Sequence, residues 1–573
     1  MDIELYFEDK SFIEQNFELK EFNLISTSYI KDYPILYILY RDKSEAYIGQ
    51  TTNARNRMKN HLKNPIRRKL KRVLLIGHDK FNQSATYNIE TNLINYFLAD
   101  GIFKLQNKSQ VSSNQVIHNY YQKQYYNEEV FQKLWDKLRQ KGLARNSSDV
   151  IQNKDVYKLS PFHQLSDSQY GVKEQIIDYC RRNLKKLKEG EHKVFLVKGE
   201  AGTGKSVVLS SLYNDLCNLS SDKDEGDKES GLYKTVNRLL VNHSEVLKTY
   251  QTMSKSLPNM KKKDILPNMK KKDIMKPTSF INSVDKEKIT KSDITLVDEA
   301  HLLLTSRDAY NGFHYENQLE EIIKRSKITI VIFDPKQVLK LKSYWDEETM
   351  DSIMSKYDTE TLYLKEQFRM NASDEIIEWI DNFVEKTILP LPKPTETFDF
   401  QICKSSKELF NKITELNKKD NLSRLVATFD FTHKKDGEEY YVDEEGINLP
   451  WNLATKGVWA EDPETLKQVG SIYTVQGFDL NNVGVILGPS VSLDEKTNSI
   501  KILQHEYKDK GAFLIPQEFE KNFSRENADS YKEEIVLNSI NILMKRAIKG
   551  LYIYAIDSKL NDYLLKLKRD MKL

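Results

Sequence analysis

The sequence predicts an α/β protein in which a small α/β domain precedes two larger lobes built on parallel sheets. From residue 159 onward, short apolar runs such as VFLVKG, ITLVDEA and ITIVIFD alternate with amphipathic segments. Buried parallel strands have continuous apolar sequences of this kind, with helices between them. Residues 34–107 differ, because two short β-rich runs, ILYILY and AYIG, are joined by the polar turn RDKSE and followed by basic helical sequence. This layout indicates a β-hairpin followed by helices.

Length and composition indicate the class of protein. The chain has 573 residues, of which 30% are charged and 39% are hydrophobic, which suits three or four domains of ordinary size. It contains no run of about eighteen apolar residues, so we expect no transmembrane helix and no membrane partner. The first ten residues, MDIELYFEDK, lack the layout of a secretory signal. Cys180, Cys217 and Cys403 fit no zinc or disulfide spacing, and we therefore expect a cytoplasmic protein.

Changes in sequence texture divide the chain into five expected segments. An amphipathic pattern in residues 127–143 predicts a helix that joins two domains, and packing in a core explains its apolar face best. That face comprises Val130, Phe131, Leu134, Trp135 and Leu138. A charged stretch at 220–231 and a duplicated LPNMKKKDI at 257–274 are expected to be surface loops. The expected segments are an N-terminal extension at 1–29, the small α/β domain at 30–118, a connecting helix and linker at 119–158, the first lobe at 159–358 and the second lobe at 359–573.

Positive charge is concentrated in one part of the chain. The formal net charge is only +3, yet residues 51–78 contain nine Lys or Arg and no Asp or Glu. A solvated helix face is the commoner explanation of such a run. Because the run overlaps a candidate active site, we favour a surface that faces nucleic-acid phosphates.

The segment VFLVKGEAGTGKS ends an apolar strand and opens a helix. Glycines at Gly199, Gly202 and Gly204 allow backbone amides to curve around phosphate groups. Lys205 then reaches the β and γ oxygens, and the Ser206 hydroxyl holds magnesium. A chance Gly-rich turn would not combine the lysine, the serine and the preceding strand. The sequence therefore predicts ATP and Mg²⁺ as cofactors.

Two adjacent carboxylates, Asp298 and Glu299, end another apolar strand in ITLVDEAH. Asp298 would hold the magnesium through its water shell, and Glu299 would orient and deprotonate the attacking water. Carboxylates after a strand are common, so this pair is informative only together with the phosphate-binding loop.

Further motifs flank these two in a characteristic order. VIFDPKQ contains Asp334 and Gln337, LKEQFRM contains Arg369, YTVQGFD contains Thr474, Gln476 and Gly477, NILMKRAIKG contains Arg546, and LSDSQ contains Gln169. With these motifs, residues 159–573 resemble the superfamily 1 helicases. Within that superfamily the closest likeness is to a bacterial family akin to the Schlafen helicase domain. The resemblance implies two RecA-like lobes carrying one P-loop ATPase site.

The same resemblance implies a role for each matching residue. Gln169 would read adenine, Gln337 would sense the γ-phosphate, and Gln476 would link the ATP state to the bound strand. Arg369 and Arg546 would stabilise charge that develops on the γ-phosphoryl oxygens, since cations brought in from a second domain can do this. Each arginine taken alone could equally form a surface salt bridge.

Two tryptophans, Trp451 and Trp459, precede the YTVQGFD motif within a polar insertion. They could stack on unpaired bases, a contact worth about 1–3 kcal/mol per base. They could also cover a small core, which is the more frequent role of tryptophan. The sequence leaves both alternatives open.

The N-terminal domain carries a second ordered set of residues. The two β-rich runs contain Tyr37 and the triplet Tyr47-Ile48-Gly49, and the chain continues to Asn53, Arg57, His61, Glu90 and Asn107. With this set, residues 34–107 resemble the GIY-YIG endonucleases, although Ile35 stands where the first triplet usually has glycine. The resemblance implies a metal-dependent nuclease.

Phosphodiester cleavage needs the chemistry that these residue types offer. Glu90 would hold Mg²⁺, with Mn²⁺ also possible, because a lone carboxylate suits an ion that keeps most of its waters. Tyr37 or Tyr47 would position or deprotonate the nucleophile, and Arg57 would clamp the phosphate. Arg57 and His61 are four residues apart and would share one helix face. Each residue alone could be structural.

Together these features predict an ATP-dependent nuclease–helicase whose partner is nucleic acid, with DNA favoured. One alternative keeps the motor and makes RNA, including transfer RNA, the substrate. Another treats the N-terminal domain as a binding module that delivers an ATP-driven switch. A role in antiviral defence is expected by analogy with similar prokaryotic fusions.

Overall fold

The structure is a computed structural model of the chain. It describes residues 5–12, 32–107, 120–161, 163, 165–199, 202–221, 231–256, 271–341, 345, 347–364, 370–434, 436–444, 446–453, 459–475, 479–514 and 525–570. The two predicted insertions, at 220–231 and 257–274, lie mostly outside these residues. None of the described helices has the length and apolar character needed to span a bilayer. The chain divides into two compact units, the first comprising Met1–Glu191, Ser206–Asp298 and Ser326–Ile328, and the second His192–Lys205, Glu299–Arg325 and Thr329–Leu573.

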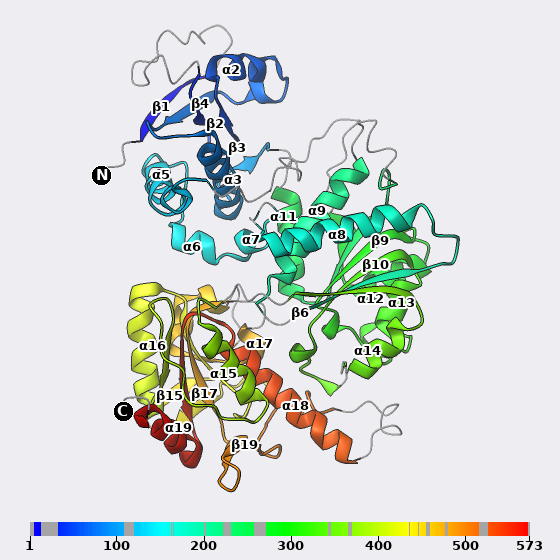
Figure 1. Ribbon diagram of the computed structural model, residues 1–573, viewed down its shortest axis with the longest axis vertical. Coiled ribbons are helices and arrows are strands. Elements are labelled where there is room, and N and C mark those ends of the chain that lie inside the picture. The colour runs from blue at the N-terminus through cyan, green and yellow to red at the C-terminus, as the bar shows by residue number, and fades with distance from the viewer. Residues whose placement is uncertain are drawn as a thin grey trace. The chain divides into compact units, whose positions relative to one another are not determined.

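A five-stranded sheet organises the N-terminal part of the first unit (Figure 1). Its strand order is β1-β4-β2-β3-β5, and only the β3–β5 pair is parallel. The strands are β1 (Tyr6–Ser11), β2 (Ile35–Arg41), β3 (Glu45–Thr51), β4 (Arg72–Gly77) and β5 (Lys104–Leu105). The predicted hairpin is β2–β3, whose register places Tyr37 opposite Gly49 and Leu39 opposite Tyr47.

Both faces of this sheet are buried, and alternation along the strands decides which residues share a face. Tyr37, Leu39 and Tyr47 point to the face that also buries Ala54 and Met58 of α2 (Ala54–Lys63). Leu36, Ile38 and their equivalents on the neighbouring strands point to the opposite face, against α3 (Gln83–Asp100). The two predicted tyrosines therefore lie on the same side of the sheet as α2, in a separate core cluster.

Residues at both ends of the predicted N-terminal domain belong to its core. Strand β1 lies within the expected extension at 1–29, yet it pairs antiparallel with β4, and Phe12 after it is fully buried. At the other end, α5 (Phe131–Gln140) packs onto the α3 face, where the Trp135 ring contacts those of Tyr96 and Phe97. The predicted apolar face of this helix is buried, so its assignment to core packing is confirmed.

The rest of the first unit contains parallel strands and their covering helices. In strand order, β9-β7-β8 are neighbours and pair in parallel. A buried ion pair, Lys173 Nζ to Asp215 Oδ2 at 2.8 Å, joins α8 to α9. The elements are α6 (Ser148–Asn153), α7 (Asp155–Lys158), α8 (Asp167–Leu184), α9 (Lys205–Ser221), β7 (Asn237–Val241), α11 (Ser244–Ser256), β8 (Ile274–Met275), α12 (Pro277–Asp285) and β9 (Ser292–Asp298).

The second unit begins with three neighbouring strands in the order β11-β6-β10. Strands β6 and β11 pair in parallel over their whole length. These elements and the helices that follow them are β6 (Lys193–Gly199), α13 (Gln318–Ile323), β10 (Ser326–Phe333), η8 (Pro335–Gln337), α14 (Glu347–Met354) and β11 (Asp358–Leu364).

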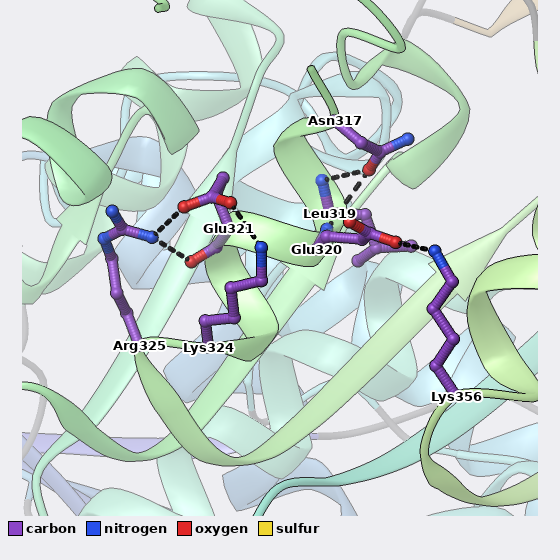
Figure 2. A network of polar contacts seen from close by, with 7 residues as sticks. All are labelled: Asn317, Leu319, Glu320, Glu321, Lys324, Arg325 and Lys356. Carbon is purple, nitrogen blue, oxygen red and sulfur yellow. Dashed lines mark hydrogen bonds and ion pairs between the residues drawn. The ribbon is translucent and has the colours of Figure 1, made fainter. Parts of the chain in front are cut away.

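Helix α13 is held by a network of polar contacts (Figure 2). The Asn317 Oδ1 atom caps the helix by accepting hydrogen bonds from two backbone amides of its first turn, at 2.9 and 3.1 Å. Glu320 on the first turn pairs with Lys356, which joins the helix to the turn before β11. At the other end, Glu321 pairs with the two cations that follow the helix, Lys324 and Arg325.

A second parallel sheet forms the C-terminal part of the second unit, in the order β12-β20-β17-β13-β16 (Figure 1). Its strands are β12 (Asp399–Ile402), β13 (Ser423–Ala427), β16 (Val469–Gly470), β17 (Leu480–Leu487) and β20 (Ala547–Ala555). The flanking helices are α15 (Asp374–Val384), α16 (Ser406–Asp420), α17 (Ile472–Val475), α18 (Arg525–Met544) and α19 (Ser558–Asp570). Two short hairpins are appended, β14 (Tyr441–Glu444) with β15 (Ile447–Pro450) and β18 (Val491–Asp494) with β19 (Ser499–Ile502). The parallel pairing confirms the expectation for the apolar runs in this region.

The two tryptophans that the sequence left undecided are core residues. Trp451 is fully buried, and its ring lies 5.5 Å from those of Phe429 and Phe431. Trp459 is 4% exposed and donates a hydrogen bond from Nε1 to Gln468 at 3.1 Å. Neither ring offers a free face on which a base could stack.

Candidate active sites

The phosphate-binding loop joins β6 to α9. The strand ends at Gly199, the helix begins at Lys205, and Gly202 and Gly204 have φ values of +89° and +74°. These are left-handed backbone conformations that glycine adopts without steric cost. The turn therefore favours glycine at two of the predicted positions, Gly202 and Gly204.

In the second unit, two motifs meet at the carboxylate of Asp334, which is fully buried at the end of β10. The Lys205 ammonium donates to Asp334 Oδ2 at 2.9 Å and to the Gly199 carbonyl at 2.7 Å. Gln337 Nε2 donates to the same Asp334 oxygen at 2.5 Å. Asp334 also caps the short helix η8 through Lys336 N. The loop lysine and the predicted γ-phosphate sensor therefore share one acceptor.

In the first unit, the Ser206 hydroxyl lies 3.3 Å from Asp298 Oδ1. The Tyr250 hydroxyl is within hydrogen-bond distance of both residues, at 3.2 Å from the Ser206 carbonyl and 3.4 Å from Asp298 Oδ2. Hydroxyl and carboxylate oxygens are the ligands that Mg²⁺ prefers, so this pair fits the ion that the sequence predicts. Tyr250 was not predicted, because no sequence motif contains it.

Glu299 follows Asp298 with φ +52°, a left-handed conformation that is rare for a residue other than glycine. Its Oε2 lies 2.8 Å from His301 Nε2. Burial alone would raise the pKa of the Glu299 carboxyl, but His301, Lys205 and Arg546 together hold this pKa below its usual value. Glu299 is therefore an ionised carboxylate directly after the strand end, as a base for water requires.

The C-terminal sheet places the predicted Arg546 directly before β20. Arg546 is 2% exposed, and its Nη1 lies 4.0 Å from Asp479 Oδ1. Lys545 is also buried and pairs with Asp381 of α15 at 2.6 Å. A buried cation needs a partner of opposite charge. Asp479 is the partner of Arg546, and Asp381 is the partner of Lys545.

The remaining predicted residues of the ATPase are only partly described. Gln169 lies in the first turn of α8, where its side chain and that of Ser166 form a reciprocal capping box. Thr474 caps the short α17 through the Ser471 amide at 2.8 Å. Arg369, Gln476 and Gly477 lie outside the described residues.

In the first unit, the N-terminal sheet and α2 bring four of the predicted nuclease residues together. The Tyr37 hydroxyl lies 2.8 Å from His61 Nε2, and it accepts a hydrogen bond from Arg57 Nε at 3.0 Å. Arg57 Nη2 also donates to the Tyr47 hydroxyl at 3.4 Å. Because the Arg57 guanidinium offers no acceptor, we assign the Tyr37 proton to the bond with His61, in the tautomer whose Nε2 is unprotonated. We call these four residues the tyrosine cluster.

Burial shifts the titration of this cluster. Burial, together with the charges of Arg57 and Arg67, lowers the pKa of His61 to about 3. Burial and the neighbouring Tyr47 raise the pKa of Tyr37 well above its usual value, although Arg57 opposes this shift. His61 is therefore a neutral acceptor and Tyr37 a neutral hydroxyl at physiological pH.

Glycine at position 49 is required by the Tyr37 ring. A Cβ atom there would lie 2.2 Å from the Tyr37 hydroxyl oxygen, a distance at which something must move. Asn107 fixes the backbone of the residue before Gly49. Its side chain accepts a hydrogen bond from Ile48 N at 3.0 Å and donates one to Ile48 O at 2.7 Å. Asn53, in turn, caps α2 by accepting from the Asn56 amide at 3.0 Å. These predicted residues thus hold the cluster in place.

Glu90 lies on α3, is 1% exposed, and contributes to the raised pKa of Tyr37 through its charge. Among the described residues, no group of three or more His, Cys, Asp or Glu side chains gathers as a metal site. A single carboxylate with water as the other ligands is the arrangement typical of Mg²⁺ rather than Zn²⁺.

The greater part of the sequence is similar to proteins of one family. The Schlafen group 3 DNA/RNA helicase domain matches residues 192–557. A Saccharomyces cerevisiae relative, "Uncharacterized protein YPL245W", is 34% identical over 444 residues, which are 73% of this chain and 94% of that protein.

Solved structures of helicases are also similar to this chain, at low scores. The Pif1 helicase from Candida albicans matches 71% of this chain and 99% of its own, with 12% identity and a TM-score of 0.28. Saccharomyces cerevisiae Dbp5 bound to RNA and ADP BeF3 matches 72% of this chain and 92% of its own, with 12% identity and a TM-score of 0.28. The family assignment rests on the sequence matches alone. The chain belongs to the Schlafen group 3 DNA/RNA helicase family.

Proposed function

We propose that this protein is an ATP-driven nucleic-acid motor whose N-terminal domain is a GIY-YIG-type, metal-dependent endonuclease. One observation carries the nuclease part: the buried Tyr37 hydroxyl lies between the guanidinium of Arg57 and the neutral ring of His61. The motor part is supported by the family and by the convergence of Lys205 and Gln337 on Asp334.

In the motor, Lys205 would exchange its contacts with Asp334 and Gly199 for the β and γ oxygens of ATP. Ser206 and Asp298 would hold Mg²⁺, which supplies charge that stabilises the phosphates when it is bound. Glu299 would deprotonate the attacking water, since its carboxylate stays ionised. Gln337 would report the loss of the γ-phosphate through Asp334.

Two arginines would complete this site. Arg546 acts on the electrostatics of Glu299, and Arg369 is proposed from its motif. Both would stabilise the charge that develops on the γ-phosphoryl group. Two glutamines are also proposed from their motifs. Gln476 would couple the ATP state to the bound strand, and Gln169 would read adenine.

In the nuclease, the tyrosine cluster offers a route for a proton. His61 would accept the Tyr37 proton through Nε2 as Tyr37 accepts one from the attacking water. Arg57 would stabilise negative charge on Tyr37 and on the phosphate. Glu90 would hold Mg²⁺ or Mn²⁺, whose charge polarises the phosphodiester when the ion is bound. Tyr47 would position the Arg57 fork.

The surface around this cluster favours nucleic acid. Of the nine cations in residues 51–78, all except Arg67 are exposed, as contacts with backbone phosphates require. We favour DNA as the substrate, and RNA, including transfer RNA, is the second candidate. The presence of Arg57 and Glu90 argues against an N-terminal domain that only binds. An antiviral role and a cytoplasmic location stay predictions.

One assay tests the proposal. Purified full-length protein is incubated with labelled single-stranded, duplex and forked DNA and with RNA, with and without ATP and Mg²⁺. We expect metal-dependent cleavage that Glu90→Ala abolishes while ATP hydrolysis survives. Cleavage that persists in Glu90→Ala would place the nuclease site elsewhere or refute it.

A further inference from the structure

One cation in the basic run differs from its neighbours. Arg67 opens the short helix η2 (Arg67–Lys69) after α2 and is 8% exposed, whereas Arg68 and Lys69 are exposed. Arginine is rarely buried to this extent without a partner. The position of Arg67 therefore requires an explanation that a solvated charge run does not provide.

The guanidinium of Arg67 covers the ring of Tyr47, with 3.4 Å between Cζ and the ring centroid. The Tyr47 ring in turn contacts that of His61, at a centroid distance of 5.1 Å. Arg67 therefore belongs to the wall of the tyrosine cluster, and its charge contributes to the lowered pKa of His61. Stacking on an aromatic ring orients a planar guanidinium and leaves its edge free to donate hydrogen bonds.

That edge is not satisfied within the protein. Arg67 Nη1 is buried and has no hydrogen-bond partner, and no carboxylate among the described residues forms a salt bridge with Arg67. Leaving a buried donor unpaired costs about 1–3 kcal/mol and more for a charged group. A buried donor of this kind needs an acceptor, which can be a water molecule, an ion or a ligand.

The chemistry of the surroundings selects an anion with several acceptor oxygens. Arg57 approaches Tyr47 from its hydroxyl end, while Arg67 covers its face, so two guanidinium groups flank one ring. His61, whose ring contacts that of Tyr47, is neutral and offers no counter-charge. Phosphate oxygens match the donor geometry of guanidinium groups in pairs.

We propose that Arg67 and Arg57 together bind one phosphodiester group of a nucleic-acid backbone in the N-terminal domain. This inference rests on the proposed nuclease and names a second phosphate-binding residue for it. Arg57 would stabilise charge at the reacting phosphate and at Tyr37. Arg67 would position that same phosphate against the Tyr47 ring.

Binding is tested with inorganic phosphate as the probe and hydrogen-exchange mass spectrometry as the readout. The full-length chain carries Lys205→Ala to silence the ATP site, and chloride at equal ionic strength is the reference. We expect phosphate to protect amides of α2 and η2 in this background and in Arg139→Ala, which removes the same charge from an exposed position on α5. The protection should be lost in Arg67→Ala and in Arg67→Met, which keeps an apolar side chain on the ring.

Protection that is absent with Arg67 present, or that persists in Arg67→Met, would overturn the inference. Because this readout needs no cleavage, it separates the two proposals. If phosphate protects these amides but the wild type does not cleave nucleic acid, the nuclease proposal is refuted and the Arg67 site stands. If the wild type cleaves but phosphate gives no protection, the nuclease proposal stands and the Arg67 site is refuted.

Cleavage gives a second readout in the otherwise unmodified chain. Arg67→Ala should lower the single-turnover rate on the order of 100-fold, the usual cost of removing one charge-stabilising donor. Arg67→Lys should restore part of that loss, because it keeps the charge without the stacked fork. Arg139→Ala, an exposed arginine on α5, is the control. An Arg67→Ala rate equal to that of the control would contradict a phosphate contact.

Discussion

Replacing Tyr37 by phenylalanine removes one oxygen atom and tests the chemistry proposed for the N-terminal domain. The ring is fully buried, so phenylalanine occupies the same space. Only the hydroxyl is lost, together with its two hydrogen bonds, the one accepted from Arg57 and the one donated to His61. The substitution thus separates the proton route from the packing of the sheet.

The loss of stability in Tyr37→Phe depends on whether the former hydrogen-bond partners of the hydroxyl, Arg57 and His61, can bond water instead. Arg57 is exposed enough to bond water instead, so its lost contact costs little. His61 is 7% exposed and loses the only donor found for Nε2 among the described residues, which costs about 1–3 kcal/mol of stability. Loss of a proton-transfer group should slow cleavage by on the order of 10²–10⁴-fold.

A matched control lies on the same strand. Tyr40 also donates and accepts a hydrogen bond through its hydroxyl, with Asp9 at 2.6 Å and Arg72 at 3.0 Å, but it faces the other side of the sheet. Single-turnover cleavage with Mg²⁺ and the ATPase rate are measured for Tyr37→Phe, Tyr40→Phe and wild type. If Tyr37→Phe cuts as fast as wild type, or if Tyr40→Phe loses as much, the proton route is refuted.

Lys205→Ala and Glu299→Gln should each abolish ATP hydrolysis, because each removes a group that acts on the γ-phosphoryl or its attacking water, while Glu299→Gln should still bind ATP in a filter assay. If the motor controls the nuclease, Lys205→Ala should also change the rate or substrate choice of cleavage with ATP present, and identical cleavage with and without nucleotide would mean that the domains are only tethered. The pKa of His61 is lowered to about 3 from 6.5, so its contribution to stability is full above pH 6.5 and is lost as the pH falls toward 3. Pulse proteolysis in urea should therefore show the N-terminal domain losing stability over this range, and His61→Asn should flatten the loss. Replacing the exposed Arg55 and Arg68 by alanine should lower the slope of log affinity against log salt by about one unit each, equally for unrelated sequences, and an unchanged slope would assign this run to a solvated surface.

Patterns that act locally were predictable from the sequence. The phosphate-binding loop requires a strand, glycines and a lysine in fixed order, and the left-handed φ values of Gly202 and Gly204 follow from that order. The apolar face of α5 was also predictable, since helical periodicity alone decides which residues share a face. Alternation along β2 and β3 likewise places Tyr37 and Tyr47 on one face.

Contacts between distant segments were decided by the tertiary structure. From the sequence we expect residues 1–29 to form an extension before the N-terminal domain, but strand β1 pairs antiparallel with β4 and belongs to the same sheet. Tyr250 reaches Ser206 and Asp298 from a helix that no motif marks. Trp451 became a core residue because Phe429 and Phe431 lie beside it.

By itself, the sequence determined that this chain combines a nucleotide-binding loop with parallel sheets, and that a basic run precedes them, since these follow from residue order. It could not separate Arg67 from Arg68 and Lys69, which are equivalent as letters in that run. Only the fold brings the Tyr47 ring beneath Arg67, so that one cation is buried in the tyrosine cluster while its neighbours stay in solvent. Exposure depends on what the rest of the chain places against a residue, and therefore the tertiary structure alone decides which charge can act in a site.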